Sequence, residues 1–140
     1  MRRQRGSLAV EFAILVPALV LLFGLIIGGA RTWLARTGVQ HMAGAAARAA
    51  SLERSPDAAQ QAANRLAAQQ AAASGMRCQP LSVHLDAAAL AQPAGITGRI
   101  TARVDCQIPL GDIIVPGWPG TVMVSANAEA VVDTYRGRTP

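Results

Sequence analysis

Residues 6–30 read GSLAVEFAILVPALVLLFGLIIGGA, and the rest of the chain is organised around this stretch. Its only charged side chain is Glu11. From Leu8 to Ala30 a helix is about 34 Å long, and the hydrocarbon core of a bilayer is about 30 Å thick. A helix that is apolar on every face has no side to turn toward water. The stretch therefore predicts a transmembrane helix in contact with the lipid bilayer.

The carboxylate of Glu11 is the most informative feature of this helix. An acid costs about 2.5–3.5 kcal/mol at the centre of a membrane helix and less near its end. Glu11 lies near the start of the span, so it is either an interfacial acid or a functional intramembrane acid. Its spacing favours a function, because three leader arginines precede Gly6, and four residues lie between Gly6 and Glu11-Phe12.

This pattern resembles the type IV prepilin processing site. In that family a peptidase cuts after the glycine, and a glutamate is the fifth residue of the mature chain. The chain also resembles the TadE-like proteins, minor pseudopilins of the tight-adherence pilus machinery, in residues 5–13 (RGSLAVEFA), Pro17 and residues 45–50 (AAARAA). The resemblance covers roughly the first 50 residues and does not separate TadE from its TadF and TadG relatives.

The resemblance implies both site residues and partners. Gly6 and Ser7 would form the prepilin peptidase site, and Glu11 and Phe12 would act in subunit assembly. The implied partners are a prepilin peptidase, an assembly platform with its ATPase, and major and minor pilins. Cleavage would free the α-amino group of Ser7, whose ammonium can meet the Glu11 carboxylate of a neighbouring subunit. Such a pair contributes to register more dependably than to net stability.

Two other functions are compatible with the sequence. The chain is alternatively a permanently membrane-anchored extracytoplasmic binding module, neither processed nor polymerised, with Glu11 as an interfacial acid. A third alternative is a secreted domain released after Ala30, because Gly28 and Ala30 form a small-x-small cleavage site. The N-terminus of the mature chain separates the three.

The basic composition does not predict nucleic-acid binding. The net charge is +5 and all 13 basic residues are arginine, but outside the leader they are spread along the chain. No dense basic patch is interleaved with aromatic residues, so no nucleic-acid partner is expected. The leader favours a cytoplasmic N-terminus in a single-pass cell-membrane protein, although Arg31 and Arg36 weaken the asymmetry. The C-terminal region is then extracytoplasmic, or part of an extracellular filament.

Cys78 and Cys106 are the only cysteines. An even count in an exported domain predicts a disulfide, and two independent buried thiols are the alternative. No metal site is expected, because there is no Cys-x-x-Cys and His41 and His84 lie in different elements. Motifs for nucleotide binding, hydrolysis or metal-dependent proteolysis are also absent from the sequence, so neither an enzyme nor a cofactor is expected.

The first helix is expected to continue without a break to about Ala50. Pro17 removes one backbone hydrogen bond, which predicts a helix kink or loosened turn, or a tolerated membrane proline. Trp33 is either an interfacial anchor or a core residue. Ser55-Pro56-Asp57 predicts the start of a second helix that runs to about Ala73, with Gly75 at its C-terminal cap.

Alternation of apolar and polar residues predicts strands at 81–86, 100–105 and 121–132, with loops at 87–95 and 109–120. A hairpin of the first two strands, with apolar faces aligned, places Cys78 opposite Gln107. A bulge near Pro80 would bring Cys78 to Cys106.

The predicted fold class is α+β. A long N-terminal transmembrane helix continues outside the membrane, and a second short helix and a small antiparallel β-sheet of about three strands follow. The expected regions are a basic leader (1–6), the transmembrane helix (7–30), an extracytoplasmic helical region (31–75) and a β region (76–140).

Overall fold

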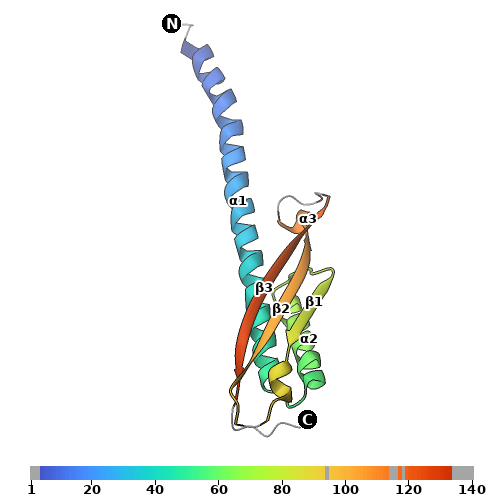
Figure 1. The fold of residues 1–140 in the computed structure, drawn as a ribbon. Helices are drawn as coiled ribbons and strands as arrows, with labels where there is room; N and C mark the ends of the chain where they lie inside the picture. The colour runs from blue at the N-terminus through green and yellow to red at the C-terminus, as the bar shows by residue number, and fades with distance from the viewer. Residues whose placement is uncertain (1–3, 94, 114–116, 118, 134–140) are drawn as a thin grey trace.

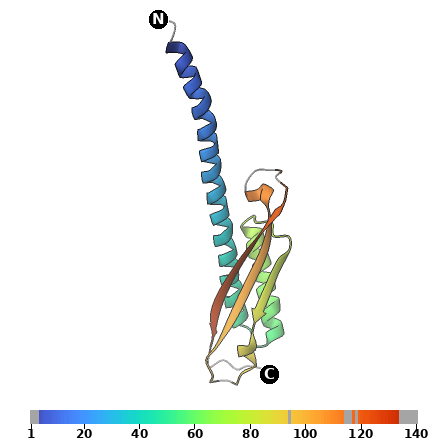
Figure 2. The ribbon, with the colours of Figure 1, turned by 45° about the horizontal axis from the view of Figure 1, so that its top comes forward.

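The computed structural model describes residues 4–93, 95–113, 117 and 119–133. Helix α1, Gln4–Ser51, is 48 residues long and passes through Pro17 as one helix. Its C-terminal half lies against the rest of the chain, and its N-terminal half extends away from every other element (Figures 1 and 2). The prediction of one continuous helix to about residue 50 is confirmed.

Helix α2, Pro56–Ala73, has the predicted ends because a side chain at its N-terminus and backbone N–H groups after its C-terminus satisfy its terminal backbone groups. The Ser55 hydroxyl accepts a hydrogen bond from the backbone N–H three residues later (3.3 Å). At the C-terminus, Gly75 adopts φ +66°, and the N–H of Met76 donates to the carbonyl of Ala71 (2.9 Å). This is a Schellman cap, for which glycine is favoured because the left-handed conformation has no Cβ penalty.

Three antiparallel strands form one sheet in the order β1-β2-β3. They are β1 (Leu81–Asp86), β2 (Gly98–Pro109) and β3 (Thr121–Val132). The first and third have the predicted bounds, and β2 extends beyond residues 100–105 at both ends because it pairs along the full length of β3. The α+β fold class is confirmed.

The register of β1 on β2, which the sequence left open, differs by two residues from the hairpin with aligned apolar faces. Leu81 lies opposite Cys106 and Val83 opposite Val104. A shift of two residues keeps each side chain on its original face, so aligning the apolar faces could not distinguish the two registers.

An irregularity near Pro80 brings the cysteines together. Gln107 accepts a hydrogen bond from the N–H of Gln79 (2.9 Å) and donates its own N–H to the carbonyl of Pro80 (3.2 Å). Gln79 and Pro80 therefore both lie opposite Gln107, as in a β-bulge. The Gln79–Pro80 peptide bond is cis. The predicted disulfide between Cys78 and Cys106 is present, with Cα atoms 4.9 Å apart.

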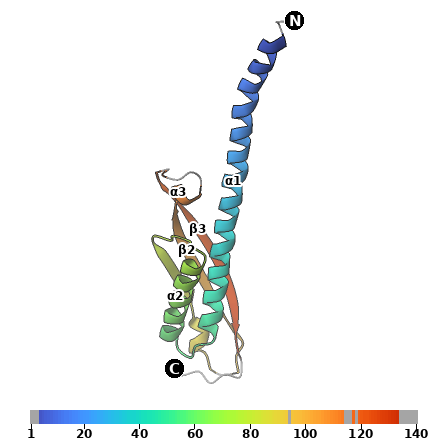
Figure 3. The same ribbon diagram turned by 180° about the vertical axis from the view of Figure 1, so that it is seen from behind.

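Both long helices cover the same face of the sheet (Figures 1 and 3). Along β2 every second residue is buried against them. Most buried helix residues are alanines, and Met42 and Leu90 are the largest fully buried side chains. Small side chains let the helices pack closely, so the core depends on shape fit more than on large apolar residues.

Residues 87–95 differ from the predicted loop. They contain a short 3-10 helix, η1 (Ala88–Ala91), which buries Ala89 and Leu90 at the edge of the core. Gly98 of β2 lies beneath η1, and a Cβ on Gly98 would approach the Cβ of Ala89 to 2.5 Å. Residue 98 therefore has room only for a hydrogen.

The predicted loop at 109–120 also begins with a short helix, α3 (Leu110–Ile113). Trp118 and the tail from Thr134 lie outside the described residues. Trp33 is 66% exposed, so the core alternative for this tryptophan is wrong.

Candidate assembly and membrane-contact site

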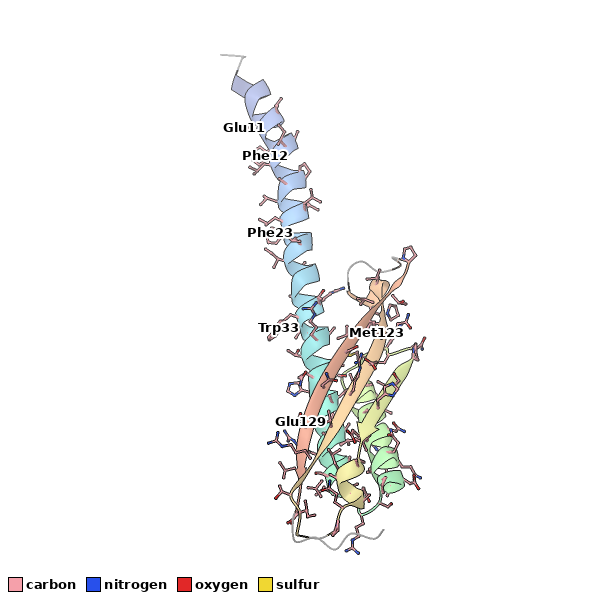
Figure 4. All side chains as sticks on the ribbon, viewed as in Figure 1. Glu11, Phe12, Phe23, Trp33, Met123 and Glu129 are labelled. Carbon is pink, nitrogen blue, oxygen red and sulfur yellow. A yellow bond between two sulfur atoms is a disulfide. The ribbon has the colours of Figure 1, made fainter. Side chains whose placement is uncertain are left out.

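The N-terminal half of α1 is the largest exposed apolar surface that the structure describes. From Val10 to Ile27 every large apolar side chain is at least 42% exposed. Phe12 and Phe23 project from a part of α1 that no other element covers (Figure 4). Burying a large apolar side chain is worth about 1.5–3 kcal/mol, so leaving these 13 in water would cost on the order of 20 kcal/mol. The surface is suited to contact with lipid or with other apolar helices.

The length of the surface matches a bilayer. Judged by length and composition, α1 is the one helix among the described residues that is apolar enough to cross a membrane. Its most apolar 18-residue window has a mean hydropathy of 2.7, and none of that window is buried within the chain. The helix is thus suited to anchor the folded part to a membrane by a single span.

Four of the predicted site residues lie together at the far end of this helix. Gly6 and Ser7 are at the start of α1, and Glu11 and Phe12 are exposed one turn later. Within the described residues, the side chain of Glu11 takes part in no hydrogen bond or ion pair. Twenty residues separate Glu11 from Arg31, or about 30 Å along a helix axis, so the two charges lie at opposite ends of the apolar stretch.

The disulfide lies in the folded part of the chain, away from the N-terminal end of α1 that holds Gly6, Ser7, Glu11 and Phe12. Cys106 is fully buried in β2, and its sulfur lies 3.9 Å from the Met76 sulfur. Cys78 precedes β1 and is half-buried. The bond therefore fixes the segment between α2 and β1 to the central strand.

The outer face of the sheet carries a charged cluster that the sequence analysis did not single out. Asp105 lies at its centre, with its side chain 14% exposed. Arg103 Nε donates to both carboxylate oxygens (3.1 and 3.2 Å), and His84 Nε2 lies 3.9 Å from Oδ2. A hydrogen bond from Ser125 and then the contacts of Arg103 lower the pKa of Asp105, although burial opposes them. The alternation of apolar and polar residues predicts that these side chains lie on the outer face of the sheet. Their contacts with one another depend on the register of the three strands.

This cluster contains the residue types of a hydrolase triad without its geometry. In a triad the histidine lies between the serine and the acid and takes the serine proton. Here Asp105 lies between Ser125 and His84, and the His84 side chain is 71% exposed. Nor do the described residues include a group of three or more His, Cys, Asp or Glu side chains placed to hold a metal ion. The cluster is suited to holding three strands together through charge and hydrogen bonds.

Comparison with known proteins places the similarity in α1. The model of the TadE-like protein family matches residues 6–48, which confirms the resemblance predicted from the sequence over that range. The match spans the exposed apolar half of α1 and most of the half that packs on the sheet. No curated protein and no solved structure matches the chain.

Proposed function

Because residues 6–48 are TadE-like, we propose that this chain is a single-pass, pilin-like membrane subunit. It takes part in assembling a tight-adherence type IV pilus or a related secretion system. The observation that carries the proposal is the apolar half of α1, exposed on all sides and continuous with a folded domain. Lipid covers this surface before assembly, and the helices of neighbouring subunits cover it afterwards.

The residues at the start of α1 have separate roles in this proposal. Prepilin peptidase cuts between Gly6 and Ser7, and the new ammonium of Ser7 pairs with Glu11 of a neighbouring subunit. Support comes from the absence of any partner for Glu11 among the described residues. A carboxylate that is costly alone in lipid becomes satisfied only on assembly, which fixes the register between subunits. Phe12 packs beside this pair, and Pro17 lets the helix bend.

The remaining features agree with export of the folded part. The arginine-rich leader favours a cytoplasmic N-terminus, and a disulfide is typical of an oxidising compartment. The proposed partners are the prepilin peptidase, the assembly platform with its ATPase, and the major and minor pilins.

The first test is the N-terminus of the mature protein in a strain with a prepilin peptidase, by intact mass or terminal sequencing. We expect a chain that starts at Ser7, and loss of this cleavage in Gly6→Ala. Gly24→Ala is the matched control, because a Cβ at Gly24 meets nothing within 4 Å and processing should be normal. A chain that retains its leader would instead indicate a permanently anchored binding module. A chain that starts at Arg31 would indicate a secreted domain.

The second test separates assembly from processing. Glu11→Gln should be cut at Ser7 and remain in the membrane, but should be depleted from the pilus or from cross-linked pilin complexes. Glu129→Gln removes an exposed carboxylate on the sheet and should assemble normally. Normal assembly of Glu11→Gln would reduce Glu11 to an interfacial acid.

A further inference from the structure

A groove lies at the end of the folded part that is nearest to the apolar half of α1. Its volume is about 710 Å³, and it is lined by residues of α1, the segment after α2, and the end of β2 with α3. Figures 1 and 3 show α3 at this end of the sheet, beside the point where α1 leaves the domain.

The groove combines cations with an apolar floor. Among the described residues, Arg31 and Arg77 line it together with one carboxylate, Asp112. Within the described part of the chain neither arginine takes part in an ion pair. Leu34, which is 60% exposed, and Met76, which packs against the core, supply apolar lining to the same groove. Two unpaired guanidinium groups beside hydrocarbon match a ligand that joins a phosphate to an acyl chain.

The position of the groove corresponds to the lipid headgroups. Arg31 is the first residue after an apolar stretch of about 34 Å, so it lies just outside a hydrocarbon core of about 30 Å. Trp33 is 66% exposed on the side of α1 turned away from the sheet (Figure 4), as expected of an interfacial anchor. The groove and Trp33 thus occupy opposite sides of α1 at the same depth.

We propose that this groove binds the phosphate of an anionic phospholipid headgroup from the leaflet on the domain's side of the membrane. Arg31 and Arg77 donate hydrogen bonds to the phosphate oxygens, and the glycerol and first acyl carbons contact Leu34 and Met76. Binding there fixes the height and tilt of the domain on the membrane. The inference rests on the membrane anchoring in the proposed function and is independent of processing and pilus assembly.

The test measures lipid selectivity of the full chain. The protein is purified in detergent, delipidated and titrated with phosphatidylglycerol or with phosphatidylcholine of the same acyl chains, and bound lipid is counted by native mass spectrometry. We expect phosphatidylglycerol, whose headgroup has a net negative charge, to bind more tightly than phosphatidylcholine, whose headgroup is neutral overall. Arg31→Gln and Arg77→Gln should each weaken it about fivefold, which corresponds to about 1 kcal/mol.

Two control variants sharpen the result. Arg65→Gln makes the same charge change at an exposed position of α2 outside the groove and should leave lipid binding unchanged. Asp112→Asn removes the one carboxylate of the lining and should strengthen phosphatidylglycerol binding. Circular dichroism should show the same fold for all variants, because the four positions are exposed.

Three outcomes would overturn the assignment. They are equal binding of both lipids, unchanged selectivity in the Arg31→Gln/Arg77→Gln double variant, and displacement of the lipid by equimolar inorganic phosphate. Vesicle flotation separates this failure from failure of membrane anchoring, because all variants should float through α1. A chain that does not float would contradict the anchoring premise itself.

Discussion

Reduction of the Cys78–Cys106 disulfide should destabilise the sheet by an amount set by the loop that it closes. The two cysteines are 28 residues apart in sequence. In the chain-entropy treatment, a loop of that length lowers the entropy of the unfolded chain by about 12 cal/mol/K, or about 3.6 kcal/mol at 25 °C. Since a small domain has only about 5–15 kcal/mol of stability, this bond contributes a large share.

Amide hydrogen exchange on the full chain in detergent measures the effect. We expect the apolar half of α1 to stay helical in detergent, so a global spectroscopic signal would understate unfolding of the sheet. Peptides from β2 report the central strand directly, and their protection should fall several-hundred-fold on reduction, as about 3.6 kcal/mol requires. Peptides from residues 10–27 should not change, because these residues are exposed and lie outside the half of α1 that packs on the sheet.

The chain offers an internal control, because these two cysteines are its only thiols. Cys78→Ala/Cys106→Ala should resemble the reduced protein and should not respond to reductant. A loss of β2 protection of less than about tenfold on reduction would refute the loop-entropy reasoning. It would mean that the bulge at Pro80 holds the segment against β2 without the covalent bond.

Other predictions concern the core, helix propensity and acid stability. Met42 is 1% exposed, so Met42→Ala should lower the free energy of unfolding in a urea titration by about 2–5 kcal/mol. Met123 is 58% exposed, so Met123→Ala should change the free energy of unfolding by less than about 0.5 kcal/mol in the same titration. Gly44→Ala should raise the melting temperature, because alanine has about 0.5–1 kcal/mol better helix propensity and a Cβ at residue 44 meets no atom within 4 Å. Gly38→Ala should raise the melting temperature less, because its Cβ would displace the end of the Met76 side chain. The pKa of Asp105 is lower in the folded protein than its ordinary value of 3.8, so the ionised side chain stabilises the fold at pH values above 3.8. This contribution is lost as pH falls through the folded pKa. Asp105→Asn should therefore make the melting temperature depend less on pH in the acid range.

Features set by neighbouring residues were predictable from the sequence. Ser55 and Gly75 mark the ends of α2 because capping depends on side chains and backbone angles within one turn. The strand at 121–132 was predictable because its alternation sorts one face from the other. The motif from Gly6 to Phe12 was recognisable because its residues occupy one short helical segment.

The register of the strands and the packing between distant segments were not predictable. A two-residue shift of β1 on β2 leaves Leu81 on its face, so the apolar pattern alone could not choose Cys106 as its partner. Leu90 lies in a short alanine-rich stretch without periodicity, and its burial depends on where η1 meets β2. The cluster around Asp105 and the groove beside Arg31 each join three segments, so their existence depended on the tertiary fold.

Because α1 is one unbroken helix, the rotation of the folded part about the helix axis is fixed relative to Glu11. With 3.6 residues per turn, each residue between Glu11 and the packed half of the helix sets about 100° of azimuth and 1.5 Å of height. Inserting a single alanine after Phe23 would therefore turn the folded part by about 100° relative to Glu11 while leaving both ends intact. The direction in which the domain faces is thus encoded by the residue count of the apolar stretch, independently of its hydrophobicity.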